Sequence, residues 1–147
     1  MKKIVFLLLF IFGSLTFAFE SHSLEFKKQI YDMITQIESA PENPKNRDKW
    51  QKILRFTIED EDVTVYLNNF VLGDKEKDKI DDDTNSILLM SYTMGALKEQ
   101  LISKKELTEV ESTTNGLKAT LKTYNRLKKT RDINIEYYEI LNKLGLD

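Results

Sequence analysis

Apolar residues recur along this chain at the three- and four-residue spacing of helices, and charged or turn-forming stretches separate them. The first predicted helix covers residues 24–39. Ser23 can accept a hydrogen bond from an amide of its first turn. Pro41 and Pro44 mark residues 41–46 as the connector that follows it. Its predicted core face consists of Phe26, Ile30, Met33, Ile34 and Ile37.

The next two segments are shorter and less regular. Residues 48–57 predict a helix that turns Trp50, Ile53 and Leu54 inward, with Trp50 as a core anchor rather than a stacking platform for a ligand. Residues 63–71 fit either a strand, because residues 63–67 alternate, or a helix. Helix is preferred, because acids at 60–62 suit a helix N-terminus and no partner strand is evident.

Residues 85–102 predict a longer helix that contains a patch of small side chains. Its predicted apolar side consists of Ile87, Met90, Met94, Leu97 and Leu101. Ser91, Gly95 and Ala96 are small, so another helix is expected to approach closely there.

The C-terminal third predicts two more helices. Ser103 and Glu106 have the spacing of a capping box, which predicts a helix start at Ser103 and an end near Lys129. A heptad-like seam keeps its phase across Asn115–Gly116, which favours one uninterrupted helix. The seam residues are Leu107, Val110, Thr114, Leu117, Leu121 and Tyr124.

The last predicted helix covers residues 135–144. Asn134 is its expected cap, Ile133 is expected to pack on Tyr138, and Gly145 is expected to end it. The chain contains only five glycines and two prolines, which disfavours an all-β fold. These patterns together predict an all-α fold, a single compact bundle of five to six helices.

The N-terminus has the pattern of a secretory signal peptide. Lys2 and Lys3 precede an apolar run at 4–12, and small residues follow up to Ala18. The run is shorter than the roughly 20 residues of a membrane-spanning helix. We therefore expect a signal peptide at 1–18 and a single helical domain at 19–147. The exported protein is expected to be periplasmic or secreted, and not a lipoprotein because the chain has no cysteine.

Composition narrows the chemistry further. The absence of cysteine excludes thiol catalysis, thiolate metal sites and disulfides. The one histidine, His22, is expected in a frayed terminus. No sequence signature of a zinc protease, an α/β-hydrolase or a phosphate-binding loop occurs. No catalytic, cofactor-binding or metal-binding residue is assigned, and no cofactor is expected. A Ser–Lys or paired-carboxylate mechanism built from distant residues stays open.

Residues 74–85 resemble a calcium loop only in part. Acids occupy loop positions 1, 3, 5 and 9, but Lys79 replaces the glycine and Asn85 replaces the bidentate glutamate. A solvated loop is the preferred interpretation.

Charge is segregated along the chain. Residues 59–83 contain ten acids and three lysines, whereas residues 112–131 contain six bases and no acid. Within the second segment, a basic strip falls within about 80° of helical arc at roughly 100° per residue. The strip consists of Lys118, Lys122, Arg126 and Lys129.

Three interpretations of the basic strip stay open. It can face solvent or the protein's own acidic loops, it can bind an acidic protein, or it can bind anionic lipid or cell-wall polymer. Nucleic acid is disfavoured, because the exported chain would have 20 bases against 24 acids.

The preferred function is protein–protein interaction in the bacterial envelope without catalysis. A periplasmic immunity or inhibitor protein against a toxin or wall enzyme is one specific form of it. The alternatives of another class are a small envelope hydrolase and a carrier of apolar ligands. The carrier's cavity would be lined by Met33, Phe70, Met90 and Met94. The pattern predicts no oligomeric state.

Overall fold

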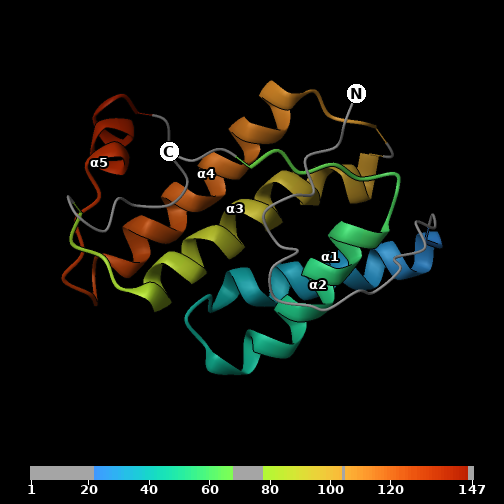
Figure 1. Ribbon diagram of the computed structural model, residues 1–147, viewed down its shortest axis with the longest axis horizontal. Helices are drawn as coiled ribbons and strands as arrows, with labels where there is room; N and C mark the ends of the chain where they lie inside the picture. The colour runs from blue at the N-terminus through green and yellow to red at the C-terminus, as the bar shows by residue number, and fades with distance from the viewer. Residues whose placement is uncertain (1–21, 68–77, 104, 146–147) are drawn as a thin grey trace, which may run out of the picture.

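The computed structural model describes residues 22–67, 78–103 and 105–145, and the regular structure in these segments is helical (Figure 1). The predicted all-α fold is confirmed. In the described segments the one β-type pairing is an isolated bridge between Lys79 and Asn134. The predicted signal peptide lies outside the described residues. The helices are α1 (Leu24–Ser39), α2 (Arg47–Glu59), α3 (Asp82–Ser103), α4 (Glu109–Leu127) and α5 (Glu136–Lys143), with a 3₁₀ turn at Pro44–Asn46.

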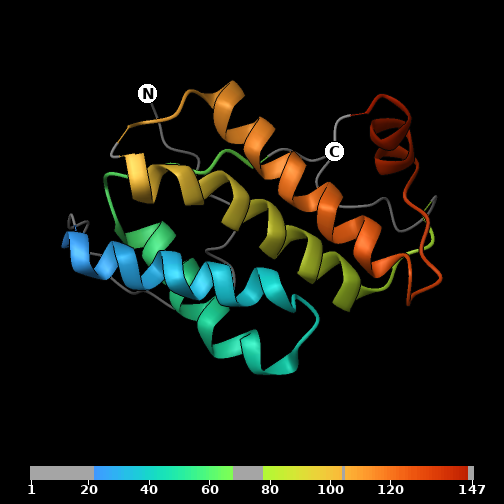
Figure 2. The same ribbon diagram turned by 180° about the vertical axis from the view of Figure 1, so that it is seen from behind.

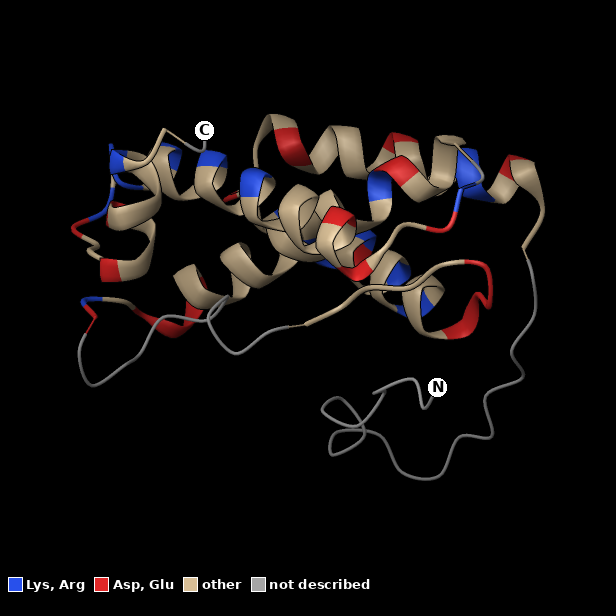
Figure 3. Ribbon diagram, turned by 90° about the horizontal axis from the view of Figure 1, so that it is seen from above, with Lys and Arg blue, Asp and Glu red and all other residues tan. Residues whose placement is uncertain are grey.

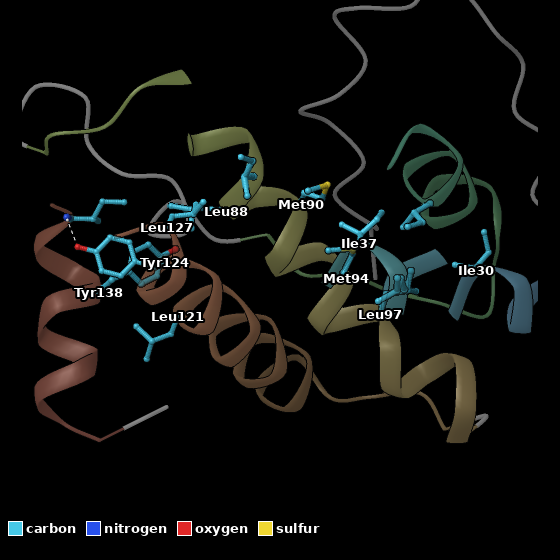
Figure 4. Packing of buried hydrophobic residues seen from close by; sticks show 14 of the residues in the cluster. Ile30, Ile37, Leu88, Met90, Met94, Leu97, Leu121, Tyr124, Leu127 and Tyr138 are labelled. Atoms are coloured by element: carbon cyan, nitrogen blue, oxygen red, sulfur yellow. Dashed lines mark hydrogen bonds between the residues drawn. The ribbon is translucent and has the colours of Figure 1, made fainter. Parts of the chain in front are cut away.

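Helix α3 is the centre of the bundle. In Figures 1 and 2 it runs between α4 on one side and the α1–α2 pair on the other, and α5 lies beside the far end of α4. The core cluster takes residues from all five helices, as the close view in Figure 4 shows for α1, α3, α4 and α5. Because α3 is covered from several directions, it buries residues around much of its circumference, including Met90, Met94 and Leu97.

The contact between α3 and α4 depends on glycine at two positions. A Cβ at Gly95 would overlap the Cβ of Ala119 and would lie 2.7 Å from the carbonyl oxygen of Asn115. A Cβ at Gly116 would lie 2.7 Å from the ring of Tyr92. The predicted close approach at the small residues of α3 is confirmed, and so is the uninterrupted helix through Asn115–Gly116.

The predicted start of this helix at Ser103 is wrong. Ser103 is the last residue of α3, and α4 begins at Glu109 after the N-cap Thr108. The capping box is formed by Thr108 and Glu111: the Glu111 amide donates to Thr108 Oγ1 (3.2 Å) and the Thr108 amide donates to Glu111 Oε2 (2.9 Å). Two S/T-x-x-E patterns occur here, and the second is used because the chain first has to reverse direction between two packed helices.

The predicted apolar seam is wrong at Val110 and Thr114, whereas Leu107, which precedes α4, is buried as predicted. Val110 is 75% exposed and Thr114 is also exposed. The buried face of α4 contains Ser112, Gly116 and Thr120, whose small size lets α3 come close. Close packing, rather than side-chain hydrophobicity, therefore determines which face of α4 is buried.

The preferred helix at 63–71 is also wrong where the structure describes it. Residues 63–67 run without helical structure across α3, while residues 68–71 lie outside the described residues. The side chain of Gln100 binds both backbone groups of Thr64. Its Oε1 accepts from the Thr64 amide (3.0 Å), and its Nε2 donates to the Thr64 carbonyl (2.8 Å). The Tyr92 hydroxyl donates to the Tyr66 carbonyl (2.5 Å). Side chains of α3 thus form hydrogen bonds with backbone groups of this segment that would otherwise be paired within a helix.

Helix α5 is capped from a distant part of the chain. The expected cap, Asn134, instead pairs its backbone with that of Lys79 (3.0 and 3.1 Å). Asp78 Oδ1 accepts from the Glu136 amide at 3.0 Å, which satisfies one of the open amides of the first turn. Ile133 and Tyr138 are both buried in the core.

The N-terminal helices follow the sequence pattern, except that Phe26, which was expected in the core, is 36% exposed. Helix α1 has the predicted bounds, and Ser23 Oγ accepts from the Phe26 amide at 3.2 Å. In α2, Ile53 is buried while Trp50 is partly buried against the core, and the deeper aromatic residue is Phe56.

Within the described residues, no helix combines the length and the apolar character needed to cross a bilayer.

Candidate partner-binding surface

All four residues of the basic strip are exposed at or just beyond the C-terminal half of α4. Lys118, Lys122 and Arg126 lie on the helix, while Lys129 follows its end at Leu127. In Figure 3, basic residues gather near the C-terminus, and the acidic turn that leads into α3 lies at the same end of the molecule, below them in this view. On a helix with roughly 100° per residue, the strip points away from the buried face of Ser112, Gly116 and Thr120.

Arg126 differs from the other three residues because it has partners inside the protein. Its Nη1 donates to the Ser39 carbonyl at 2.8 Å, and its Nη2 donates to Glu42 Oε1 at 3.2 Å. These bonds join the end of α4 to the connector between α1 and α2. Arg126 therefore has a structural role that sequence spacing did not reveal.

The three lysines of the strip form no ion pair with any residue in the described part of the chain. We call Lys118, Lys122 and Lys129 the lysine surface. The acidic segment pairs with other bases: Lys27 with Asp62 (2.7 Å), Arg55 with Glu59 (2.7 Å) and Arg131 with Asp83 (2.8 Å). Among the described residues, the acids of 59–83 therefore do not neutralise the lysine surface.

A second polar region surrounds α5 and contains several carboxylates. Its open pocket of about 720 Å³ includes Asp78, Lys128 and Glu139. Glu139 accepts hydrogen bonds from Lys128 and from the Tyr124 hydroxyl, and these bonds, with Lys128 the larger cause, lower the pKa of Glu139. Burial, followed by the bond to Glu139, raises the pKa of Tyr124 to about 12. A catalytic acid needs a pKa raised toward neutrality, so this arrangement favours a role for Glu139 in holding α5 on α4.

His22 is anchored rather than frayed, which corrects the sequence-based expectation. The side chain of Asp60 is fully buried; it accepts from the His22 amide at 2.9 Å and from the Asp62 amide at 2.9 Å. His22 Nδ1 lies 3.0 Å from the same carboxylate. Asp60 thus joins the start of α1 to the end of α2. Asp60 stands in a run of four acids at 59–62, so the sequence pattern does not distinguish it as the one that is buried.

The methionines at helical spacing divide between core and surface. Met90 and Met94 are buried in the core, while Met33 lines an open groove of about 330 Å³ between α1 and α2. Phe70 lies outside the described residues. The cavity proposed for a carrier between the helices is therefore not formed by Met90 and Met94.

No group of three or more histidine, aspartate or glutamate side chains in the described segments is arranged to hold a metal ion. Residues 74–77, which supply the first acids of the calcium-like loop, lie outside these segments. Comparison of the chain with protein-family models, curated proteins and solved structures finds no match in any of the three.

Proposed function

We propose that this protein is an exported bacterial binding protein that holds an acidic protein partner on its lysine surface and performs no catalysis of its own. The observation that carries the proposal is that Lys118, Lys122 and Lys129 are exposed and form no ion pair within the described residues. They lie close together on or just beyond the C-terminal half of α4, whereas several other bases, such as Lys27 and Arg131, are paired.

Two physical features support a role in binding. Helix α4 is anchored along its length by the contact with α3, so the lysines project from a rigid support and little ordering is needed on binding. No intramolecular ion pair of the three lysines within the described residues has to break first. Complementary charge then speeds association and disfavours basic partners.

An inhibitor or immunity protein is the specific form that we favour within this class. Such a protein needs export, a stable scaffold and a preformed charged surface, and it needs no catalytic groups. The predicted signal peptide and the anchored α4 agree with these requirements.

The test is affinity capture from envelope extracts with matched charge variants. Lys118, Lys122 and Lys129 are changed together to Glu, and the control changes Lys28, Lys49 and Lys143 on α1, α2 and α5 to Glu. Both variants alter net charge equally. We expect the first variant to lose an acidic protein that the wild type and the control retain.

Equal capture by all three proteins would refute the role of the lysine surface. Loss of binding to anionic lipid vesicles or wall polymer, with no protein captured, would replace the proposed partner with a membrane or wall ligand.

A further inference from the structure

We propose that the groove between α1 and α2 binds a small amphipathic molecule that has an apolar tail and an anionic head group. This α1–α2 groove has a volume of about 330 Å³ and lies on different helices from the lysine surface. The proposal is therefore independent of the proposed function.

The floor of the groove is apolar and held in place by ring contacts. His22 stacks on Phe26 with ring centres 4.8 Å apart, and Phe56 lies 5.3 Å from His22 and 6.0 Å from Phe26. His22 is itself fixed by the buried carboxylate of Asp60. Because the three rings support one another, the floor is formed before any ligand arrives.

Apolar surface remains open to solvent at this floor. Phe26 is 36% exposed and Met33 is partly exposed, whereas Ile30 and Phe56 close the groove from below. Displacing water from such a concave apolar surface favours binding of an alkyl chain or an aromatic ring.

The rim of the groove on α2 is cationic. Lys52 and Arg55 are three positions apart, so they lie on the same side of the helix. Arg55 Nε donates to Glu59 Oε1 at 2.7 Å, which holds the guanidinium in place and neutralises Glu59. The terminal nitrogens of Arg55 and the ammonium of Lys52 have no hydrogen bond to a residue in the described segments. Lys52 and Arg55 together with Glu59 leave one net positive charge at the rim, which favours an anionic head group.

The size of the groove favours a small molecule over a protein segment. Its volume is near the lower end of ligand sites, which span about 300–1,000 Å³. A short fatty acid or an aromatic carboxylate matches both the apolar floor and the cationic rim.

Calorimetric titration of the purified protein with decanoate and with decylammonium tests this proposal directly. We expect saturable one-site binding of decanoate, about fivefold or more tighter than that of decylammonium. Affinity should rise from hexanoate to octanoate to decanoate by about two- to fourfold per methylene. Amide resonances of α1 and α2 residues at the groove should shift in the NMR spectrum as decanoate is added.

Two single variants locate the head group. Lys52→Glu should weaken decanoate binding by about fivefold and strengthen binding of decylammonium. Lys28→Glu makes the same change in charge at an exposed position of α1 that does not line the groove, and it should leave both affinities within about twofold.

Three results would overturn the proposal: no saturable binding of decanoate, equal affinity for the two head groups, or an equal effect of Lys28→Glu and Lys52→Glu. Binding of an acidic phenylalanine-containing peptide at the groove residues, with no binding of decanoate, would assign the groove to a protein segment instead.

Discussion

Gly95 shows how a single missing side chain determines the distance between two helices. Its Cα faces Ala119 and the Asn115 carbonyl so closely that an added methyl group would overlap them. Backbone atoms of α4 cannot turn aside as the end of a flexible side chain can, so α3 and α4 would have to separate.

We therefore expect Gly95→Ala to lower the free energy of unfolding by about 1–3 kcal/mol, despite the better helix propensity of alanine. Urea unfolding followed by circular dichroism measures the change. Adding Ala119→Gly should recover part of the loss, because it removes the overlapping methyl group. A Gly95→Ala protein as stable as the wild type would show that the helices are not in close contact at this point.

Glu111 provides a test of the electrostatics at the start of α4. The hydrogen bond from Lys105, followed by bonds from the Thr108 backbone and side chain, lowers the pKa of Glu111 to about 2. Because the pKa is lower in the folded state, the contribution to stability is present above the ordinary glutamate pKa of 4.5 and is lost as the pH falls toward 2.

Glu111→Gln removes the charge and keeps an amide oxygen that can accept the capping bond. The variant should show a smaller loss of stability than the wild type between about pH 6 and about pH 3. Urea midpoints at the two pH values provide the comparison. Identical pH profiles would mean that Glu111 does not hold its charge through these contacts.

At the level of helices and connections, the segment at 63–67 depends on α3 rather than on its own sequence. Gln100 is the residue that holds it, with one bond to the Thr64 amide and one to the Thr64 carbonyl. A third bond, from Gln100 Nε2 to the Ala96 carbonyl (2.9 Å), fixes the orientation of the side chain.

Gln100→Ala should therefore destabilise the protein by about 1–3 kcal/mol and should release the Thr64 amide to fast hydrogen exchange. Exchange measured by NMR on the variant separates this local effect from global unfolding. The matched control is Ile102→Ala, two positions away on α3 and 62% exposed. If the Thr64 amide remains protected in Gln100→Ala, the proposed bond to Gln100 does not hold the segment.

Sequence reasoning was successful where local signals and packing agree. Ser23, the apolar stripe and Pro41 determine α1 together, and the predicted bounds are those observed. The all-α class followed from the same periodicity and from the scarcity of glycine and proline.

Predictions from the sequence are wrong where a residue far away in the chain determines the local structure. Asp78 caps α5 from 58 positions away, and Gln100 binds a segment 36 positions earlier, so local patterns contain neither interaction. The same limit applied to the basic strip. Its exposure followed from helical spacing, but the bonds of Arg126 to Ser39 and Glu42 depend on how α1 and α4 meet.

At the scale of the whole molecule, the predicted signal peptide determines where the protein can meet a partner. We expect the exported chain to begin at Phe19, after cleavage behind the small residues Thr16 and Ala18. Mass spectrometry of the protein from the envelope or the medium measures this directly. A full-length chain retained in the membrane would contradict it.

Site-specific photo-crosslinking tests the central claim most directly. A photoreactive residue is placed at Lys122, at the middle of the lysine surface, and in a second protein at Lys28 on α1. In intact cells, the position on α4 should crosslink to an acidic protein, and the yield should fall when Lys118 and Lys129 are changed to Glu. Equal crosslinking from both positions, or none from Lys122, would contradict the account.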